Sequence, residues 1–190
     1  MMRALPHMKV VSPADPAEAE AIARYATAHG GPLYVRLGKS GEPILHPEHI
    51  SECPPGRAIV VREGDDVTLM STGVVLAAAL AAADQLAKSG VSVRVISSPW
   101  IKPLDEETIL RAASETAGIV TIEDHTLQGG FGSAVLELLS DKDITKPVRR
   151  VGFPDSPSKL VGSSSYLMAA AGVDPEAVMA AARGLLRLPH

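Results

Sequence analysis

Residues 118–135 read GIVTIEDHTLQGGFGSAV, and this stretch decides the fold. It begins with GIVTIE, an apolar and β-branched run that is typical of a buried strand. From about residue 131 to residue 140 the spacing of apolar residues predicts a helix. Glu123 ends this strand, Asp124 and His125 follow it, and the glycines of GGFG lie at the start of the helix. Ligands of open α/β sheets bind at the carboxyl ends of the strands, so this turn is a candidate functional site.

Glu123, Asp124 and His125 are the groups in this turn that could carry acid/base chemistry. A carboxylate that orients the imidazole would let His125 act as a general base. Because consecutive strand residues point to opposite faces, Glu123 and His125 can share a face while Asp124 does not. A polar network at a subunit contact is the alternative use, and the lack of a G-x-S-x-G motif favours it.

The glycine cluster of Gly129, Gly130 and Gly132 could leave backbone N–H groups free at a helix start, where anions bind. Its spacing matches neither G-x-G-x-x-G nor the phosphate-binding G-x-x-x-x-G-K-[ST], and no lysine follows. The alternative is a tight turn that lets the helix pack closely against the sheet. The residues favour this second interpretation.

The chain around this stretch alternates strands with helices. We predict strands at 58–62, 67–71, 91–97, 118–123 and 147–152, and helices at about 74–89, 105–117, 131–140, 158–171 and 175–186. Short connections between alternating elements predict an α/β domain of three layers around a mostly parallel sheet. We assign residues 57–190 to this domain.

The first part of the chain is too short to be a domain of its own. It has a predicted strand at 8–13, a helix from Asp15 to about residue 28, and a second strand at 33–37. Asp15 is the expected N-cap, with Pro16 in the first turn and Glu18 completing a capping box. This order predicts a parallel strand pair, an incomplete βαβ piece of a larger sheet, over residues 1–37.

Residues 38–56 contain several prolines and glycines and no sustained apolar period, which predicts a linker. Within it, His46 and His49 of the H-P-E-H segment are weak metal-ligand candidates because a proline separates them. Cys53 is the one cysteine, so no internal disulfide can form, and we interpret it as a loop residue without a chemical role. Arg36, just before the linker, could bind a phosphate through its guanidinium or form a surface salt bridge.

The composition excludes several classes of partner. Of the 190 residues, 46% are hydrophobic but only 3% are aromatic, and the formal net charge is −4. With no basic cluster and few aromatic residues, neither nucleic acid nor an anionic membrane surface is an expected partner. The start, MMRALPHMKV, has no apolar segment of signal-peptide type, and VVLAAALAAA at 74–83 is too short to cross a bilayer. We expect a cytoplasmic protein.

Several motifs together resemble the C-terminal part of transketolase. They are RALPHMKVVSPADPAEAEA, LYVRLGK, STGVVLAAALAAADQL, IKPLDEETI, IEDHTLQGGFGSAV and VGFPD, in this order over nearly the whole chain. The resemblance includes bacterial and archaeal transketolases split into two subunits, with 1-deoxyxylulose-5-phosphate synthase and the β subunit of 2-oxo acid dehydrogenases as relatives. After VGFPD the sequence SPSKLVGSSSYL is more polar than the usual aromatic continuation of the family.

The resemblance implies that residues 1–37 are the end of a pyrimidine-binding domain and that residues 57–190 are the C-terminal domain. The assembled enzyme would use thiamine diphosphate and magnesium to transfer a two-carbon ketol unit between sugar phosphates. This chain alone would bind neither, since it lacks the G-D-G…N motif and the glutamate that activates the cofactor in the family. The implied partners are an N-terminal transketolase half or subunit, a second copy of the chain and a sugar phosphate.

The resemblance carries over to few individual residues. Arg36 matches an arginine that contacts the substrate phosphate in transketolases. Glu123 and the glycines of GGFG match a motif with a mainly architectural role near the dimer contact. The alternatives are a fragment like 1-deoxyxylulose-5-phosphate synthase or like the β subunit of 2-oxo acid dehydrogenases, or a non-catalytic assembly or anion-binding module with the same fold. Such a module would ignore thiamine diphosphate.

Overall fold

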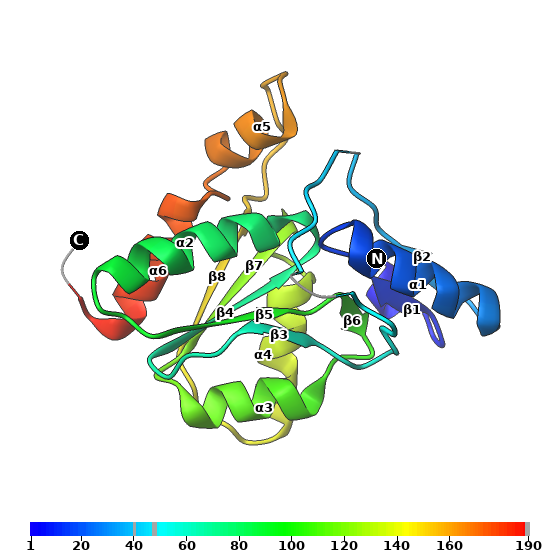
Figure 1. The fold of residues 1–190 in the computed structure, drawn as a ribbon, viewed down its shortest axis with the longest axis horizontal. Helices are drawn as coiled ribbons and strands as arrows, with labels where there is room; N and C mark the ends of the chain where they lie inside the picture. Colours follow the sequence, from blue (N-terminus) through cyan, green and yellow to red (C-terminus); the bar gives the residue numbers. More distant parts are fainter. Residues whose placement is uncertain (40, 47–48, 189–190) are drawn as a thin grey trace.

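The computed structural model describes residues 1–39, 41–46 and 49–188, which form two β-sheets with helices around them (Figure 1). A five-stranded sheet has the order β3-β5-β4-β7-β8, and a three-stranded sheet has the order β2-β1-β6. In the view of Figure 1, the small sheet and its helix lie to the right of the large one. The predicted α/β fold class is confirmed.

The large sheet is parallel except at one edge. Its strands are β3 (Ile59–Arg62), β4 (Val67–Thr72), β5 (Val93–Ser97), β7 (Ile119–Thr126) and β8 (Val148–Phe153). The pairs β4–β5, β4–β7 and β7–β8 are parallel, whereas β3 runs antiparallel to β5. Because β7 continues to Thr126, the EDH segment lies inside the strand rather than after it.

Helices cover both faces of this sheet, which gives the predicted three layers (Figure 1). The helices are α2 (Leu76–Lys88), α3 (Glu106–Glu115), α4 (Phe131–Asp141), α5 (Ser164–Ala170) and α6 (Pro175–Leu186). Helices α2 and α6 lie on one face and α3 and α4 on the other, while the short α5 projects from the body. A short 3-10 turn, Gly73–Val75, precedes α2.

Side chains that alternate between the two faces of the large sheet form the two halves of the core. In β4, Val67 and Leu69 pack with α2 and α6, whereas Met70 packs with α3 and α4. In β7, Ile122 belongs to the first cluster and Ile119 to the second. Side chains buried on both faces are the expected pattern for a sheet with helices on both sides.

The small sheet contains the predicted βαβ piece and one strand that the sequence did not predict. Strands β1 (Lys9–Val11) and β2 (Leu33–Val35) pair in parallel around α1 (Pro16–Ala28), as expected. The unpredicted strand, β6 (Trp100–Lys102), pairs antiparallel with β1. Strand β6 follows β5 along the chain, so it links the small sheet to the large one.

The start of α1 differs from the predicted capping box in one detail. The Asp15 side chain accepts a hydrogen bond from Glu18 N at 2.9 Å, as an N-cap should. The Glu18 carboxylate, however, accepts from Ala14 N at 2.6 Å, one residue earlier than the capping-box pattern. This leaves the second oxygen of Glu18 available for groups beyond the helix.

The predicted linker has neither helix nor strand at its described residues, 38–39, 41–46 and 49–56. It is nevertheless anchored to the fold, because His46 and Cys53 are buried. Among the helices that the structure describes, none is long and apolar enough to cross a membrane.

Candidate functional site

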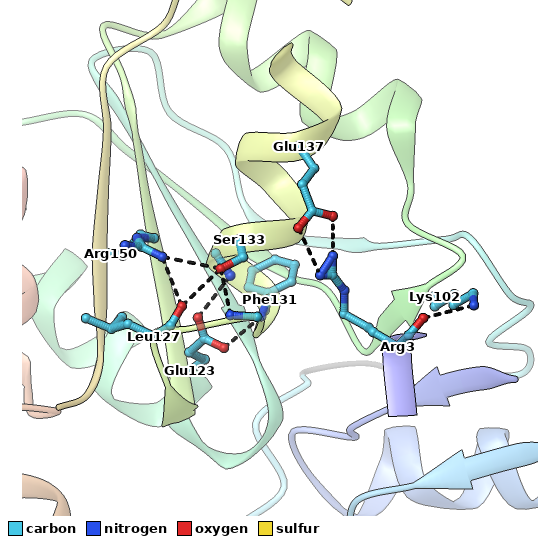
Figure 2. A network of polar contacts seen from close by, with 10 residues as sticks. Arg3, Lys102, Glu123, Leu127, Phe131, Ser133, Glu137 and Arg150 are labelled. Atoms are coloured by element: carbon cyan, nitrogen blue, oxygen red, sulfur yellow. Dashed lines mark hydrogen bonds and ion pairs between the residues drawn. The ribbon is translucent and has the colours of Figure 1, made fainter. Parts of the chain in front are cut away.

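The two sheets meet at the carboxyl ends of β1, β4 and β7, where the sequence placed its candidate residues. A cavity of about 260 Å³ opens there, and Ser12, Arg36, Thr72, Glu123 and His125 are among its lining residues. A short 3-10 helix near the N-terminus, Met2–Ala4, also borders this cavity. Arg3 holds that helix in place through hydrogen bonds to Glu137 in α4 (Figure 2).

Glu123 points into the start of α4 (Figure 2). Its side chain is buried, with Oε2 accepting from Phe131 N at 2.7 Å and Oε1 from Gly132 N at 2.9 Å. These are N–H groups that a helix start leaves without partners inside the helix. The protein's own carboxylate therefore occupies the anion-binding position that the glycine cluster offers.

The glycines make this approach possible because there is no room for larger side chains. A β-carbon at Gly130 would lie 1.9 Å from Glu123 Oε2, and one at Gly132 would lie 2.6 Å from Thr121 Oγ1. Gly129 adopts a φ of +70°, and its N–H donates to Ser133 Oγ at 3.1 Å. The turn thus lets a helix pack closely on a strand, which was the interpretation that the residues favoured.

The ionisation of Glu123 is set by opposing effects. Burial raises the pKa of this carboxyl above its ordinary value. The hydrogen bonds from Gly132 and Phe131, and the nearby His125 and Arg150, act in the opposite direction without cancelling the effect of burial. Arg150 itself donates to the carbonyl of Leu127 at 2.9 Å, which closes the other side of the turn (Figure 2).

His125 is exposed, and the hydrogen bond of its ring goes to its own strand. Its Nδ1 lies 2.8 Å from the carbonyl oxygen of Thr126. The predicted pairing in which Glu123 orients His125 is not what this geometry displays, since both Glu123 oxygens accept from α4. A role of His125 as a general base stays a prediction.

Arg36 and Asp124 form a polar link between the two sheets. Nη1 of Arg36 pairs with Asp124 Oδ1, and Nη2 donates to the Asp124 carbonyl oxygen at 2.8 Å. The Arg36 side chain is 35% exposed and that of Asp124 only 14%. A guanidinium has five N–H donors, so Arg36 keeps donors for a ligand while Asp124 holds its orientation. The sequence named both residues but did not predict their pairing.

A wider groove of about 610 Å³ lies beside the same pair. It separates Arg36, Lys39 and Asp124 from the segment 153–171, which carries α5. Arg36 lines both the cavity and the groove, so it stands at the point where they adjoin.

A second buried polar cluster fixes the linker and was not predicted from the sequence. Asp15 Oδ2 accepts from Leu45 N at 2.8 Å and lies 3.0 Å from His46 Nδ1. On the other side of the imidazole, Nε2 lies 3.3 Å from Glu18 Oε1, an oxygen that accepts from Ser97 Oγ at 2.5 Å. The cluster therefore joins the linker, α1 and β5.

The two carboxyl groups of this cluster titrate differently. For Glu18, burial is the largest influence and raises its pKa. For Asp15, burial acts in the same direction, but hydrogen bonds from Glu18, His46 and Leu45 together outweigh it and lower the pKa. Among the residues that the structure describes, Nε2 of His46 has no partner with good hydrogen-bond geometry, although it faces Glu18.

The remaining candidates, which are linker residues, lie away from the place where the two sheets meet. His46 is turned toward Asp15 and His49 is exposed, while the two residues between them are outside the described part of the chain. Cys53 is buried, and burial together with Glu18 raises its pKa to about 11. A thiol with such a pKa is not a nucleophile near neutral pH, which agrees with its interpretation as a residue without a chemical role.

Comparison with known proteins shows which family the chain belongs to. Residues 56–178 match the model of the transketolase C-terminal domain. The chain belongs to the transketolase C-terminal domain family. One solved neighbour is a split-gene transketolase described as an inactive β4 tetramer, with a TM-score of 0.89, 39% identity and coverage of 100% of this chain.

Two sequence relatives represent different named activities. A 1-deoxy-D-xylulose-5-phosphate synthase of Geobacter sulfurreducens is 39% identical over 97% of this chain. A 6-deoxy-6-sulfo-D-fructose transketolase subunit of a Clostridium species is 38% identical over 96% of the chain. The chain spans 29% of the synthase, 56% of the transketolase subunit and 60% of the split transketolase chain. The predicted resemblance to the C-terminal section of transketolase is confirmed.

Proposed function

We propose that this transketolase C-terminal chain acts as part of a thiamine-diphosphate-dependent enzyme that transfers a two-carbon ketol unit between sugar phosphates. The family relationship supports the cofactor for the whole enzyme, and the relative named as a transketolase subunit supports a division into chains. When bound, the cofactor supplies the chemistry of carbon–carbon bond cleavage and formation. This chain supplies a substrate-phosphate ligand and a supporting domain.

The described residues of this chain do not fit the diphosphate and magnesium of that cofactor. The helix start beside the glycine cluster donates the N–H groups of Phe131 and Gly132 to Glu123. Among the described residues no group of three or more His, Cys, Asp or Glu side chains is arranged to hold a metal ion. Cofactor binding is therefore assigned to residues outside this chain.

The observation that carries the proposal is the fixed position of Arg36 at the junction of the two sheets. Asp124 accepts from two of its nitrogens, so the guanidinium is oriented before a substrate arrives. Pre-orientation lowers the conformational entropy that the Arg36 side chain would otherwise lose when a ligand binds. In the assembled enzyme we assign Arg36 to the phosphate of the sugar substrate.

A second candidate function is the 1-deoxy-D-xylulose-5-phosphate synthase reaction, because relatives at 39% identity bear that name. Both candidates place a phosphorylated substrate at Arg36 and differ in the carbonyl compound that the whole enzyme accepts. The solved split-gene neighbour, of which this chain covers the larger share, favours transketolase as the first choice.

The test is to purify the chain from its own cells at native expression and identify its partner by mass spectrometry. We expect a chain with a G-D-G…N segment in equal amount, and ketol transfer by the complex with ribose 5-phosphate as acceptor. Arg36→Met in this complex should raise the KM for the sugar phosphate about 10-fold or more, since one charge-assisted contact is lost. A chain that is isolated alone and inactive with any added N-terminal half contradicts the proposal.

Assembly is a further part of the proposal. We propose that the chain self-associates and joins an N-terminal transketolase half, because β2 lies at the edge of its sheet in the described chain. Size-exclusion chromatography with light scattering should give a dimer or larger species. A monodisperse monomer at micromolar concentration would argue against self-association.

A further inference from the structure

The groove beside Arg36 has a charge that is opposite to that of the whole chain. The chain has a formal net charge of −4. The groove, in contrast, is lined by the cations of Arg36, Lys39 and Lys159 and by the single carboxylate of Asp124. Its charged side chains therefore sum to about +2, which focuses a positive potential into a concave site.

The cations come from two segments that face each other across the groove. Arg36 and Lys39 lie just after β2, whereas Lys159 belongs to the segment between β8 and α5. Neither lysine forms an ion pair with a carboxylate of the described residues, while Arg36 is paired with Asp124. An anion between the segments would therefore meet two ammonium groups whose charge is not already neutralised.

Hydroxyl groups and apolar surface complete the lining. Thr126, Ser156, Ser158 and Ser164 contribute hydroxyls, and Leu167 is among the apolar residues that line the same groove. Hydroxyls of this kind suit the polyol of a sugar, which offers both donors and acceptors. The volume of about 610 Å³ lies within the range of about 300–1,000 Å³ that is usual for small-molecule sites.

We propose that Lys39 and Lys159 form, with Arg36, a site that selects a sugar phosphate over a sugar sulfonate. A phosphate monoester has a charge of about −1.5 to −2 at pH 7, which matches the groove's charge of about +2. A sulfonate carries a single negative charge and leaves part of the positive charge uncompensated. The inference rests on the proposed function, because Arg36 is shared, and it assigns the substrate class to phosphates rather than to the sulfo-sugar named for the Clostridium relative.

The experiment is a binding titration of the whole chain, followed by NMR or calorimetry. The probes are ribose 5-phosphate, ribose, inorganic phosphate and 6-deoxy-6-sulfoglucose. We expect ribose 5-phosphate to bind more tightly than ribose or inorganic phosphate, and at least about threefold more tightly than the sulfonate. Equal affinity for the phosphate and the sulfonate overturns the proposal.

Matched variants test which lysine side chains contribute to binding. Lys39→Met combined with Lys159→Met should weaken ribose 5-phosphate binding about tenfold and remove the preference over the sulfonate. The control is Lys142→Met, since Lys142 lies in the α4 C-terminal region and pairs with Glu106, away from the groove. Unchanged affinity in the double variant, or an equal loss in the control, overturns the role of the groove.

The same variants separate this inference from the proposed function. If the purified complex performs ketol transfer and responds to Arg36→Met but not to the double lysine variant, the proposed function stands and the groove inference fails. If the isolated chain shows the lysine-dependent preference for phosphate but no complex transfers a ketol unit, the groove inference stands and the proposed function fails.

Discussion

Gly130 lies so close to Glu123 that a β-carbon added at Gly130 would meet the carboxylate oxygen Oε2 at 1.9 Å. The same oxygen accepts the N–H of Phe131 and the side chain is buried, so any displacement of the carboxylate breaks a buried hydrogen bond. Gly130→Ala should push the carboxylate away from the helix start and leave a buried charge and two N–H groups poorly paired. We expect the free energy of unfolding to fall by about 1–3 kcal/mol in urea denaturation.

Gly184→Ala is the matched control for this change. Gly184 is exposed in α6, and a β-carbon there has no atom within 4 Å. Removing a glycine from a helix interior should raise the free energy of unfolding by about 0.5–1 kcal/mol. If Gly130→Ala does not lower the free energy of unfolding relative to Gly184→Ala, the result contradicts the close packing of Glu123 against the glycine turn.

Glu18 gives a pH-dependence of stability with a definite sign. Burial raises the pKa of its carboxyl above the ordinary value of 4.5, so the folded state binds this proton more tightly than the unfolded state. The stabilisation is complete below pH 4.5 and is lost as the pH rises through the higher pKa of the folded state. Denaturation of the wild type and of Glu18→Gln from pH 4.5 to 8 should show the wild type losing stability relative to the variant. A constant difference across this range would contradict the raised pKa.

Asp15, on the same helix, should respond with the opposite sign. Its pKa is lowered by hydrogen bonds, so it stabilises the fold above its ordinary value of 3.8 and loses this effect in acid. Asp15→Asn should therefore lower the free energy of unfolding most near neutral pH. The difference in this free energy between the variant and the wild type should shrink as the pH falls toward 3. A difference that grows in acid would mean that burial, and not hydrogen bonding, decides the pKa of Asp15.

Much of the fold could be predicted because its signals are local. The N-cap of Asp15, the apolar period of α2 and the β-branched run of β7 each lie within one element. Strand β6 escaped prediction because it is three residues long and owes its existence to pairing with β1, about 90 residues earlier. The antiparallel direction of β3 is likewise fixed by its partner and not by its own residues.

The candidate site was predicted as a set of residues but not as a set of contacts. Arg36 and Asp124 are 88 positions apart, and nothing in either local sequence indicates their pairing. His46 was assigned to a linker because of the prolines around it, whereas its contacts with Asp15 and Glu18 bury it. One signal was available for Glu123: an acidic residue at the end of the predicted strand, eight residues before a glycine-flanked helix start, is placed to cap that helix.

His46 should hold the linker against the fold. Its ring lies between Asp15 and Glu18, so His46→Asn should weaken both contacts and release the described residues around it. We expect a loss of about 1–3 kcal/mol in the free energy of unfolding and faster proteolytic cleavage within residues 38–56. His49→Asn, at an exposed position of the same segment, should change stability by less than about 0.5 kcal/mol. Equal cleavage rates in the two variants would contradict this anchoring role.

Cys53 should resist alkylation as long as the chain is folded. Its side chain is buried, and the pKa of about 11 leaves only about 0.1% of the thiol ionised at pH 8, whereas a free cysteine of pKa about 8.5 is about one quarter ionised. The indole N–H of Trp100 donates to the carbonyl oxygen of Cys53 at 3.0 Å and keeps this part of the linker against β6. Reaction with iodoacetamide at pH 8 should therefore be slower by at least about a hundredfold than in 6 M guanidinium, as followed by mass spectrometry. Rapid alkylation of the native protein would mean that residues 49–56 open readily, and the accompanying loss of contact with Trp100 should then be visible in its fluorescence.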